Sequence, residues 1–302
     1  MWPIINILLS TVAPIISVAL LGMLLDRIRP IDPRSLSPII IYLATPALVF
    51  EAIANSTIGG AEVRGLILFG LLLSSAITLI AWLISRWSKM DRLTAGTFVL
   101  TASLINVVNY GFPLNELAFG QAGLERVIVV SMPIILYANT VGVFLASWGQ
   151  ASIWQAVRNT LVIPLPYAAA LGLVVNMGQI AVPAPIMDFA SILGQASIPL
   201  MLIILGIQIS RTTLDGQWKV MMGAASIRLM GGAVVGLILA YLLGLEGVSR
   251  QVAIVEAAMP TAVLAGVLAT EFNDNAQLVS SIILLSTLLS IITLPIIIFL
   301  VS

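Results

Sequence analysis

The chain has 302 residues, of which 60% are hydrophobic and 9% charged, and its formal net charge is zero. Its mean hydropathy of +1.13 lies outside the range of soluble domains, so lipid is its expected solvent. The sequence contains no histidine and no cysteine, which excludes imidazole or thiolate metal sites, Ser/His and Cys/His nucleophilic catalysis, and disulfides. We therefore expect neither an enzyme nor a cofactor, and the lack of a basic patch argues against a nucleic-acid partner.

Ten apolar stretches, separated by short polar connectors, are each long enough to cross a bilayer, which takes about 20 residues. Stretches such as 4–25 and 280–300 are apolar nearly all round, which is typical of membrane helices and not of barrel strands. We expect an all-α polytopic membrane protein with ten transmembrane helices and no soluble domain. The expected spans are 4–25, 36–55, 64–85, 93–119, 124–148, 159–176, 186–210, 218–243, 250–272 and 276–300.

Lysine and arginine are distributed unevenly over the connectors, and cytoplasmic connectors are the ones enriched in these residues. The connectors after odd-numbered spans contain Arg27, Arg29, Arg34, Arg86, Lys89, Arg92, Arg158, Arg211 and Lys219. Those after even-numbered spans contain Arg64, Arg126 and Arg250. We therefore expect a multi-pass protein of the cell (inner) membrane with both termini extracytoplasmic.

Ten spans that start outside the cell place the first and sixth helices in opposite directions. Two five-helix repeats, 1–150 and 151–302, are then related by inverted topology. The stretch 42–48 in the second span corresponds to 195–201 in the seventh, each with a proline, and 19–22 corresponds to 169–172. Short apolar words recur by chance, but together with the charge pattern they favour the repeat.

The fourth and ninth spans contain motifs that tend to interrupt a helix. The stretch from Asn106 to Pro113 begins about 18 Å into its helix and Met259-Pro260-Thr261 about 15 Å into the other, so both lie near the membrane centre. Proline lacks an N–H group, and the backbone groups that it frees need protein or a water-filled cavity. We predict interruptions at 106–113 and 258–261 and a crossing of the two helices; alternatively, the prolines only kink them.

Half-helices that begin at Pro113 and Pro260 direct their N-terminal ends, which favour an anion, toward the centre, while the carbonyl ends of the first halves favour a cation. We expect Asn106 to contact substrate directly, because an amide binds a carboxylate without burial of a further charge. The candidate substrate-binding residues, which include two from the fifth span, are Asn106, Asn109, Tyr110, Gly111, Pro113, Tyr137, Asn139, Met259, Pro260 and Thr261.

Two ionisable residues lie deep in apolar spans. Arg228 is about 13 Å from the cytoplasmic end of its helix and Glu256 about 10 Å from the outer end of its own, and a charge at such depth needs a partner. The length of the Arg228 side chain allows the two to pair. Glu256 is then either the site of a coupling cation, Na⁺ or H⁺, with Arg228 adjusting its charge, or one half of a structural salt bridge.

The motifs of these spans resemble the auxin efflux carrier family, in its bacterial permease-type branch. The pattern Asn106-x4-Gly111-x-Pro113-Leu114 is similar to the family's Asn-x4-Gly-x-Pro-Leu, and 257–272 and 45–50 are similar to its ninth and second helices. The resemblance covers nearly the whole chain. It implies a scaffold of helices 1, 2, 6 and 7, a transport domain of helices 3–5 and 8–10, an elevator-like movement and a homodimer. It also implies that Asn106 contacts substrate and that Pro260 is the crossover proline.

The chain departs from the plant carriers in two places. Tyr42 stands where they have a lysine, and the third span has no aspartate matching theirs, so auxin is not the expected substrate. The stretch Glu256-Ala257-Ala258-Met259 distantly resembles the ninth helix of bile-acid sodium symporters, in which the glutamate helps to bind sodium.

Three functions remain open from the sequence. The leading hypothesis is a secondary transporter of a small organic anion, a carboxylate, that works by alternating access. The second is a sodium-coupled symporter of the bile-acid-symporter type, and the third is a membrane channel or sensor. A channel normally has rings of polar side chains along one axis, whereas the polar groups here cluster at one depth, which favours a carrier.

Overall fold

The computed structural model describes residues 2–147, 162–212, 214–272 and 275–302, and in these ranges the chain is helical apart from its connectors. The predicted all-α class is therefore confirmed. The expected repeat boundary at 150/151, the ends of the fifth and sixth spans at 148 and 159, and Arg158 lie outside the described residues.

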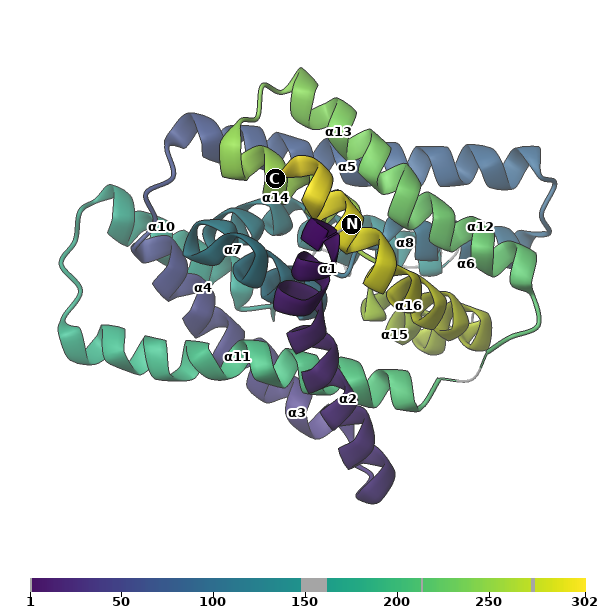
Figure 1. Ribbon diagram of the computed structural model, residues 1–302, viewed down its shortest axis with the longest axis horizontal. Helices are drawn as coiled ribbons and strands as arrows, with labels where there is room; N and C mark the ends of the chain where they lie inside the picture. The colour runs from purple at the N-terminus through teal and green to yellow at the C-terminus, as the bar shows by residue number, and fades with distance from the viewer. Residues whose placement is uncertain (1, 148–161, 213, 273–274) are drawn as a thin grey trace.

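The helices follow one another along the chain with short connectors (Figure 1). They are α1 (Trp2–Ile7), α2 (Ala13–Ile28), α3 (Pro33–Ile39), α4 (Thr45–Ala54), α5 (Gly60–Trp87), α6 (Arg92–Ser103), α7 (Phe112–Tyr137), α8 (Val143–Ala146), α10 (Leu165–Met177), α11 (Ala184–Ser210), α12 (Trp218–Ser226), α13 (Gly232–Leu242), α14 (Gly247–Ala257), α15 (Val263–Glu271) and α16 (Ala276–Val301). Turns of π-helix are η1 (Leu8–Val12), η2 (Ile40–Ala44), η3 (Val107–Gly111), η4 (Ala138–Gly142) and η5 (Ile227–Gly231).

Seven helical segments of the described chain are long and apolar enough to cross a membrane. They are Trp2–Ile28, Ser35–Ala54, Gly60–Trp87, Val107–Ala146, Ala184–Ser210, Trp218–Leu242 and Ala276–Val301. The ninth expected span is divided between α14 and α15, and the sixth contains the shorter helix α10. The fourth ends at Gly120, where a φ of 65° turns the chain inside α7, a backbone conformation that glycine adopts without strain.

The π-helical turns explain how the helices pass their prolines. Pro14, Pro46 and Pro113 each lie in the first turn of an α-helix that directly follows η1, η2 or η3. Because proline cannot donate to the carbonyl one turn earlier and its ring crowds that carbonyl, the preceding turn widens to π geometry and the helix continues.

The helices pack in two groups. The first helix group is α2, α4, α10 and α11, in which α11 lies against both α2 and α4 and α10 lies against α4. The second helix group is α5, α6, α7 and α12 to α16, centred on the contacts of α5 with α7 and of α14 with α7 and α13. Figure 1 shows α11 and α2 in its lower half and α5 and α13 along the upper edge. The groups meet where η3 lies against α11 and α4 against α7.

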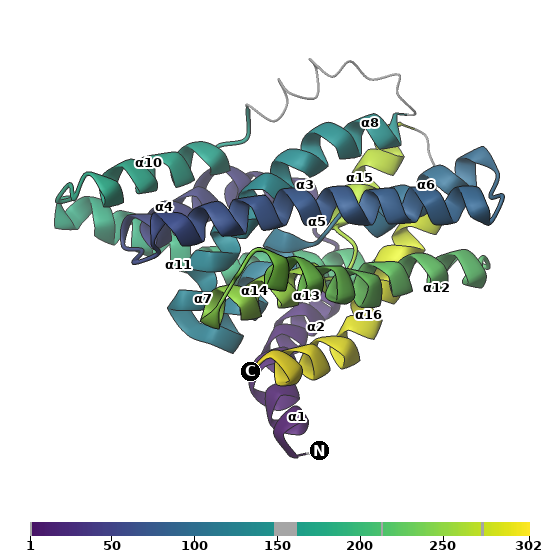
Figure 2. The ribbon, with the colours of Figure 1, turned by 90° about the horizontal axis from the view of Figure 1, so that it is seen from above.

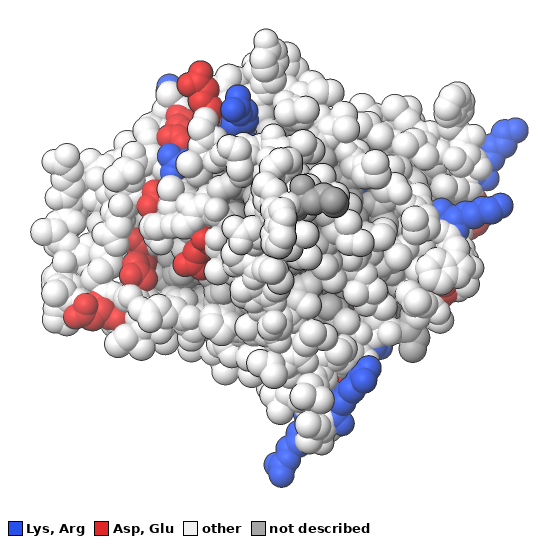
Figure 3. All heavy atoms as spheres, in the orientation of Figure 1, with Lys and Arg blue, Asp and Glu red and all other residues white. Residues whose placement is uncertain are grey.

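On the face drawn in Figure 3, charged side chains lie mostly toward the edges of the molecule. In Figure 3 a broad uncharged surface separates lysine and arginine, gathered mostly at the right and lower edges, from aspartate and glutamate, gathered toward the left. Large apolar side chains such as Leu21, Phe189 and Tyr241 are exposed, as lipid contact requires. The two termini lie close together, with α1 packed on α16 (Figure 2).

Close backbone contacts hold the first helix group together. A Cβ atom at Gly206 of α11 would overlap the carbonyl of Ala19 in α2, and one at Gly22 of α2 would overlap the carbonyl of Ile203 in α11. Small residues that admit such approach are the usual means of helix association in membranes, where the hydrophobic effect does not drive it.

We expect Gly206→Ala to destabilise the protein by about 1–3 kcal/mol, because the new methyl group pushes α2 away from α11. The matched control is Gly60→Ala at the start of α5, where a Cβ would meet no atom within 4 Å. Thermal unfolding of both variants in detergent, followed by tryptophan fluorescence, measures the difference. Equal melting temperatures for the two variants would show that this contact does not determine the packing.

Candidate functional site at the helix crossover

Two interrupted helices cross inside the second helix group. After α6 the chain is extended at Leu104 and Ile105 and turns at Asn106, and after α14 it is irregular from Ala258 to Ala262. Ile105 and Thr261 form an antiparallel bridge, in which Asn106 N donates to Pro260 O at 3.0 Å and Ala262 N donates to Leu104 O at 2.9 Å. Backbone N–H and C=O groups freed at one break are therefore hydrogen-bonded to those freed at the other, which lipid could not do.

The first interruption lies earlier than the sequence predicts. It was expected at 106–113 with a new helix from Pro113, but the helix breaks at 104–106 and resumes with η3 at Val107. The physical reason is that the π-helical turn accommodates Pro113, so the proline does not itself break the helix. The second interruption matches the expected 258–261 closely, although the following helix starts at Val263 and not at Pro260.

Arg228 binds backbone carbonyls at the C-terminal ends of α6 and α14, the helices that precede the two breaks. Its side chain is fully buried on η5, and its Nε donates to Met259 O at 3.1 Å and its Nη1 to Ala102 O at 3.1 Å. Its Nη2 donates to Ala257 O. These carbonyls belong to the last turns of α6 and α14 and to the break after α14, where a positive charge also meets the negative end of each helix dipole.

Glu256 does not form the direct salt bridge with Arg228 that the sequence suggests. The Arg228 guanidinium is bound to the backbone carbonyls of Met259, Ala102 and Ala257 instead. Glu256 is fully buried, and its Oε2 accepts from Asn115 Nδ2 at 3.0 Å. The pairing that the sequence suggests is wrong, because the backbone carbonyls at the helix breaks are the closer partners of Arg228. The sequence had led us to expect a bound cation at these carbonyls.

Asn115 is the site residue that sequence reasoning missed. It lies in the first turn of α7, fully buried, and its Nδ2 donates both to Glu256 and to Gly111 O at 2.9 Å. The signal was present, since Asn115 is the third asparagine within ten residues, two positions after Pro113. Gly111 completes this contact, because its Cα faces the carboxylate and leaves no room for a side chain.

Asn106 lies at the bridge between the two breaks and is 4% exposed. Its backbone N–H is bonded to Pro260, but its side-chain Nδ2 has no hydrogen-bond partner in the described structure. Thr261 is satisfied from both sides: its Oγ1 donates to Thr101 O at 2.9 Å, and its N–H donates to Ser286 Oγ. The crossover therefore presents one unused amide donor in a buried, polar setting.

The remaining candidates divide into two sets. Tyr110 is buried beside the crossover, its hydroxyl accepts from Ser290 Oγ at 3.5 Å, and Asn109 beside it is half-buried. Asn139, by contrast, donates to Ile135 O of its own helix, and Tyr137 lies beside Thr78 of α5. The contacts of these last two side chains do not reach the crossover residues in the part of the chain described here.

A cavity of about 980 Å³ opens between the two helix groups. Its walls come from α3, η2 and the end of α11 on one side and from α15 and α16 on the other. Polar and charged side chains in the wall include Asp32, Tyr42, Gln208, Arg211 and Glu271. The cavity therefore opens beside α15, the half-helix that follows the second break.

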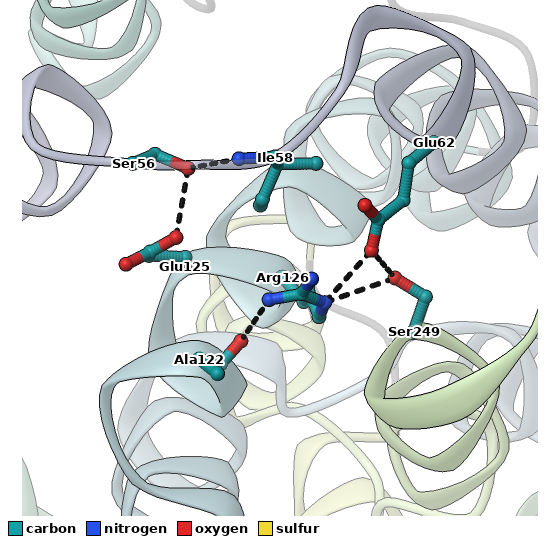
Figure 4. Close-up of polar contacts among 7 residues, drawn as sticks. All are labelled: Ser56, Ile58, Glu62, Ala122, Glu125, Arg126 and Ser249. Atoms are coloured by element: carbon teal, nitrogen blue, oxygen red, sulfur yellow. Dashed lines mark hydrogen bonds and ion pairs between the residues drawn. The ribbon is translucent and has the colours of Figure 1, made fainter.

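Polar contacts join helices elsewhere in the molecule (Figure 4). Arg126 Nε donates to Glu62 Oε1 at 2.8 Å and to Ser249 Oγ at 3.1 Å, which ties α7 to α5 and α14. Ser56, in the connector between α4 and α5, donates to Glu125 Oε2 at 2.8 Å. The bond from Ser56 to Glu125 links the connector that leaves the first helix group to α7 of the second group.

Apolar spanning helices, two of which are interrupted and cross where polar side chains are buried, are typical of membrane transporters. The model of the membrane transport protein family matches residues 7–298, and the chain belongs to this family. The predicted resemblance to auxin efflux carriers is thereby confirmed at the level of the family.

The chain is also similar to individual proteins that are named as transporters or carriers. The chain is 28% identical to an uncharacterized transporter of Methanothermobacter thermautotrophicus over 95% of its length and 96% of the relative. It is 22% identical to an uncharacterized transporter of Methanocaldococcus jannaschii over 86% and 87% of the two chains. A probable auxin efflux carrier component 9 of Oryza sativa is 28% identical over 46% of this chain and 34% of the relative.

The contact between Gly111 and Glu256 is testable by substitution. A Cβ at residue 111 would lie 2.6 and 2.7 Å from the two carboxylate oxygens. We therefore expect Gly111→Ala to cost about 1–3 kcal/mol of stability, most of which disappears when Glu256→Ala removes the carboxylate. Melting temperatures of the single and double variants give the coupling.

The control for this cycle is Gly231→Ala, where the nearest atom to a Cβ lies at an ordinary 3.6 Å. We expect this variant to unfold at the wild-type temperature, with or without Glu256→Ala. Strictly additive effects of Gly111→Ala and Glu256→Ala would contradict the contact between the two residues.

Proposed function

We propose that the protein is a secondary active transporter of a small organic anion, a carboxylate, bound at the helix crossover. The observation that carries this proposal is the unpaired Nδ2 of Asn106, a buried donor in need of an acceptor. A buried hydrogen-bond donor without an acceptor destabilises the protein by about 1–3 kcal/mol. A carboxylate oxygen of the substrate can accept from this donor and so offset that cost. The start of the helix at η3, directly after Asn106, adds the positive end of a helix dipole.

An elevator-like movement fits the division into two helix groups. In this proposal the first helix group, helices 1, 2, 6 and 7 of the expected ten, is the scaffold, and the second helix group carries the crossover as the transport domain. The crossover is held inside the second group by hydrogen bonds and by Arg228, so it is suited to move as one body. A homodimer formed through the scaffold, as the family resemblance implies, belongs to the same proposal.

Two inverted repeats of five helices are supported by paired contacts. Gly22 and Gly172 stand at corresponding positions of the proposed repeats. Gly22 packs against Ile203 of α11, and Gly172 packs against Phe50 and Ile53 of α4. Each first helix thus lies on the second helix of the other repeat, which is the relation that an in-plane two-fold axis produces.

The proposed orientation makes the large cavity face the cytoplasm. Its wall includes Arg211 and the residues after α2, which lie in connectors assigned to the cytoplasm by their basic residues. The structure then corresponds to an inward-facing state, in which the polar contacts of Figure 4 lie at the outer end. A channel is less well supported than a carrier, because the buried polar groups gather at one crossing and do not line an axis.

Substrate recognition by Asn106 is tested by counterflow in proteoliposomes against a panel of mono- and dicarboxylates. For each acid that exchanges, we expect Asn106→Ala to raise KM about tenfold or more, since a hydrogen bond to a charged group is worth about 1.5–3 kcal/mol. Asn139→Ala is the control, because Asn139 donates within its own helix. Unchanged KM in Asn106→Ala would remove this residue from the site.

The orientation is tested by thiol labelling, which the absence of native cysteine makes unambiguous. We expect Ser302→Cys to react with a membrane-impermeant maleimide added outside intact cells. Ser88→Cys, in the connector after α5, should react only after the membrane is opened. The reverse pattern would place the termini in the cytoplasm and contradict the proposed topology.

A further inference from the structure

The crossover has unused hydrogen-bonding capacity of two kinds. Asn106 Nδ2 is a donor without an acceptor, whereas Glu256 Oε1 and Asn115 Oδ1 are acceptors without a donor, among the described residues. An anion supplies an acceptor but no donor, so it satisfies only the first of these needs. The acceptors at Glu256 and Asn115 can be satisfied by a proton bound to the carboxylate or by a cation, because carboxylate and amide oxygens both accept hydrogen bonds and ligate hard metal ions.

The place where a metal cation would bind the helix ends is already filled. The carbonyls of Ala102, Ala257 and Met259 accept from the Arg228 guanidinium, each from a different nitrogen. Gly232, one turn along from Arg228, permits this arrangement, because a Cβ there would overlap Ala257 O and approach the guanidinium. The protein thus provides its own fixed cation at these carbonyls.

Resting on the proposed carrier function, we propose that transport is coupled to a proton held by Glu256 and not to sodium. Arg228 is in this account a positioning residue that takes the place of a coupling metal ion. A proton from water on one side binds Glu256 Oε1 while the substrate carboxylate binds at Asn106. Both are released to water on the other side, so the site returns to its starting protonation and no bond of the substrate changes.

Charge balance at the buried site supports this coupling. With Arg228 positive and Glu256 negative the site is neutral, and the arrival of a monocarboxylate would leave it with a net negative charge. An unbalanced charge at the membrane centre is strongly unfavourable. Protonation of Glu256 restores neutrality, which predicts one proton for each monocarboxylate.

The surroundings of Glu256 leave Arg228 as the charged group that acts on it. The helices packed against α14 are α5, α7, α13 and α16, and the last two contain no charged residue. On α5 and α7, Glu62 and Arg126 are bonded to each other (Figure 4), and Arg64, Arg86, Glu116 and Glu125 do not contact the Glu256 carboxylate in the described structure. The hydroxyl of Tyr110, on η3, accepts from Ser290.

The first test uses proteoliposomes with radiolabelled lactate, pyruvate, succinate and malate as probes. For acids that exchange, an inside-alkaline pH gradient should drive accumulation, and replacing sodium with choline should leave the rate unchanged. Glu256→Gln should retain exchange but lose pH-driven accumulation, because the amide cannot carry the proton. The control Glu116→Gln, on α7 and half-buried, should retain both. Accumulation driven by a sodium gradient, or by the pH gradient in Glu256→Gln, would overturn the proposal.

The second test does not depend on a transported acid, so it separates failure of the coupling from failure of the carrier function. In detergent, sodium chloride and choline chloride should give the wild-type protein the same melting temperature. Arg228→Ala should melt at a lower temperature, and millimolar guanidinium should restore several degrees in a saturable manner. Arg250→Ala, an exposed arginine of α14, should show neither effect. Saturable stabilisation of the wild-type protein by sodium would overturn the proposal even if none of the probe acids exchanges.

Discussion

The arrangement of the site depends on how the backbone freed at two helix breaks is satisfied within a membrane. Lipid offers no hydrogen bonds, so each carbonyl exposed at a break needs a partner from the protein or from water. Arg228 supplies three of them, at Ala102, Ala257 and Met259, and the backbone bonds around Ile105 and Thr261 supply others. Without these contacts two interrupted helices would not remain crossed in the bilayer centre.

The same contacts divide the packing of the molecule into two helix groups. Arg228 joins η5, α6 and α14 into one unit, whereas the first helix group is held by close glycine contacts such as Gly206 on Ala19. Between the two groups lies the large cavity, whose walls come from both. In the proposed carrier, this boundary is where the second helix group slides against the first while each keeps its internal packing, as alternating access requires.

Much of the fold was predictable from the sequence because a membrane span has to be long and apolar, and the motifs at Asn106 and Pro260 located both breaks. The details at Pro113 were not, because sequence does not show whether a proline breaks a helix or is absorbed by a π-helical turn. Arg228 and Glu256 were recognised as buried charges, but their partners were not, since three-dimensional proximity decided between a carboxylate and carbonyls. Asn115 was missed because it stands next to Glu116, near the expected outer end of the span, and the sequence does not show that it turns inward to Glu256.

The central claim is that the crossover at Asn106 is the place where substrate binds and from which it is released. The most direct test is labelling of Asn106→Cys, in a chain with no native cysteine, by a small water-soluble methanethiosulfonate reagent in membrane vesicles. The account predicts labelling from the cytoplasmic side and protection by those carboxylates that exchange in counterflow. Labelling that no transported acid reduces would contradict it.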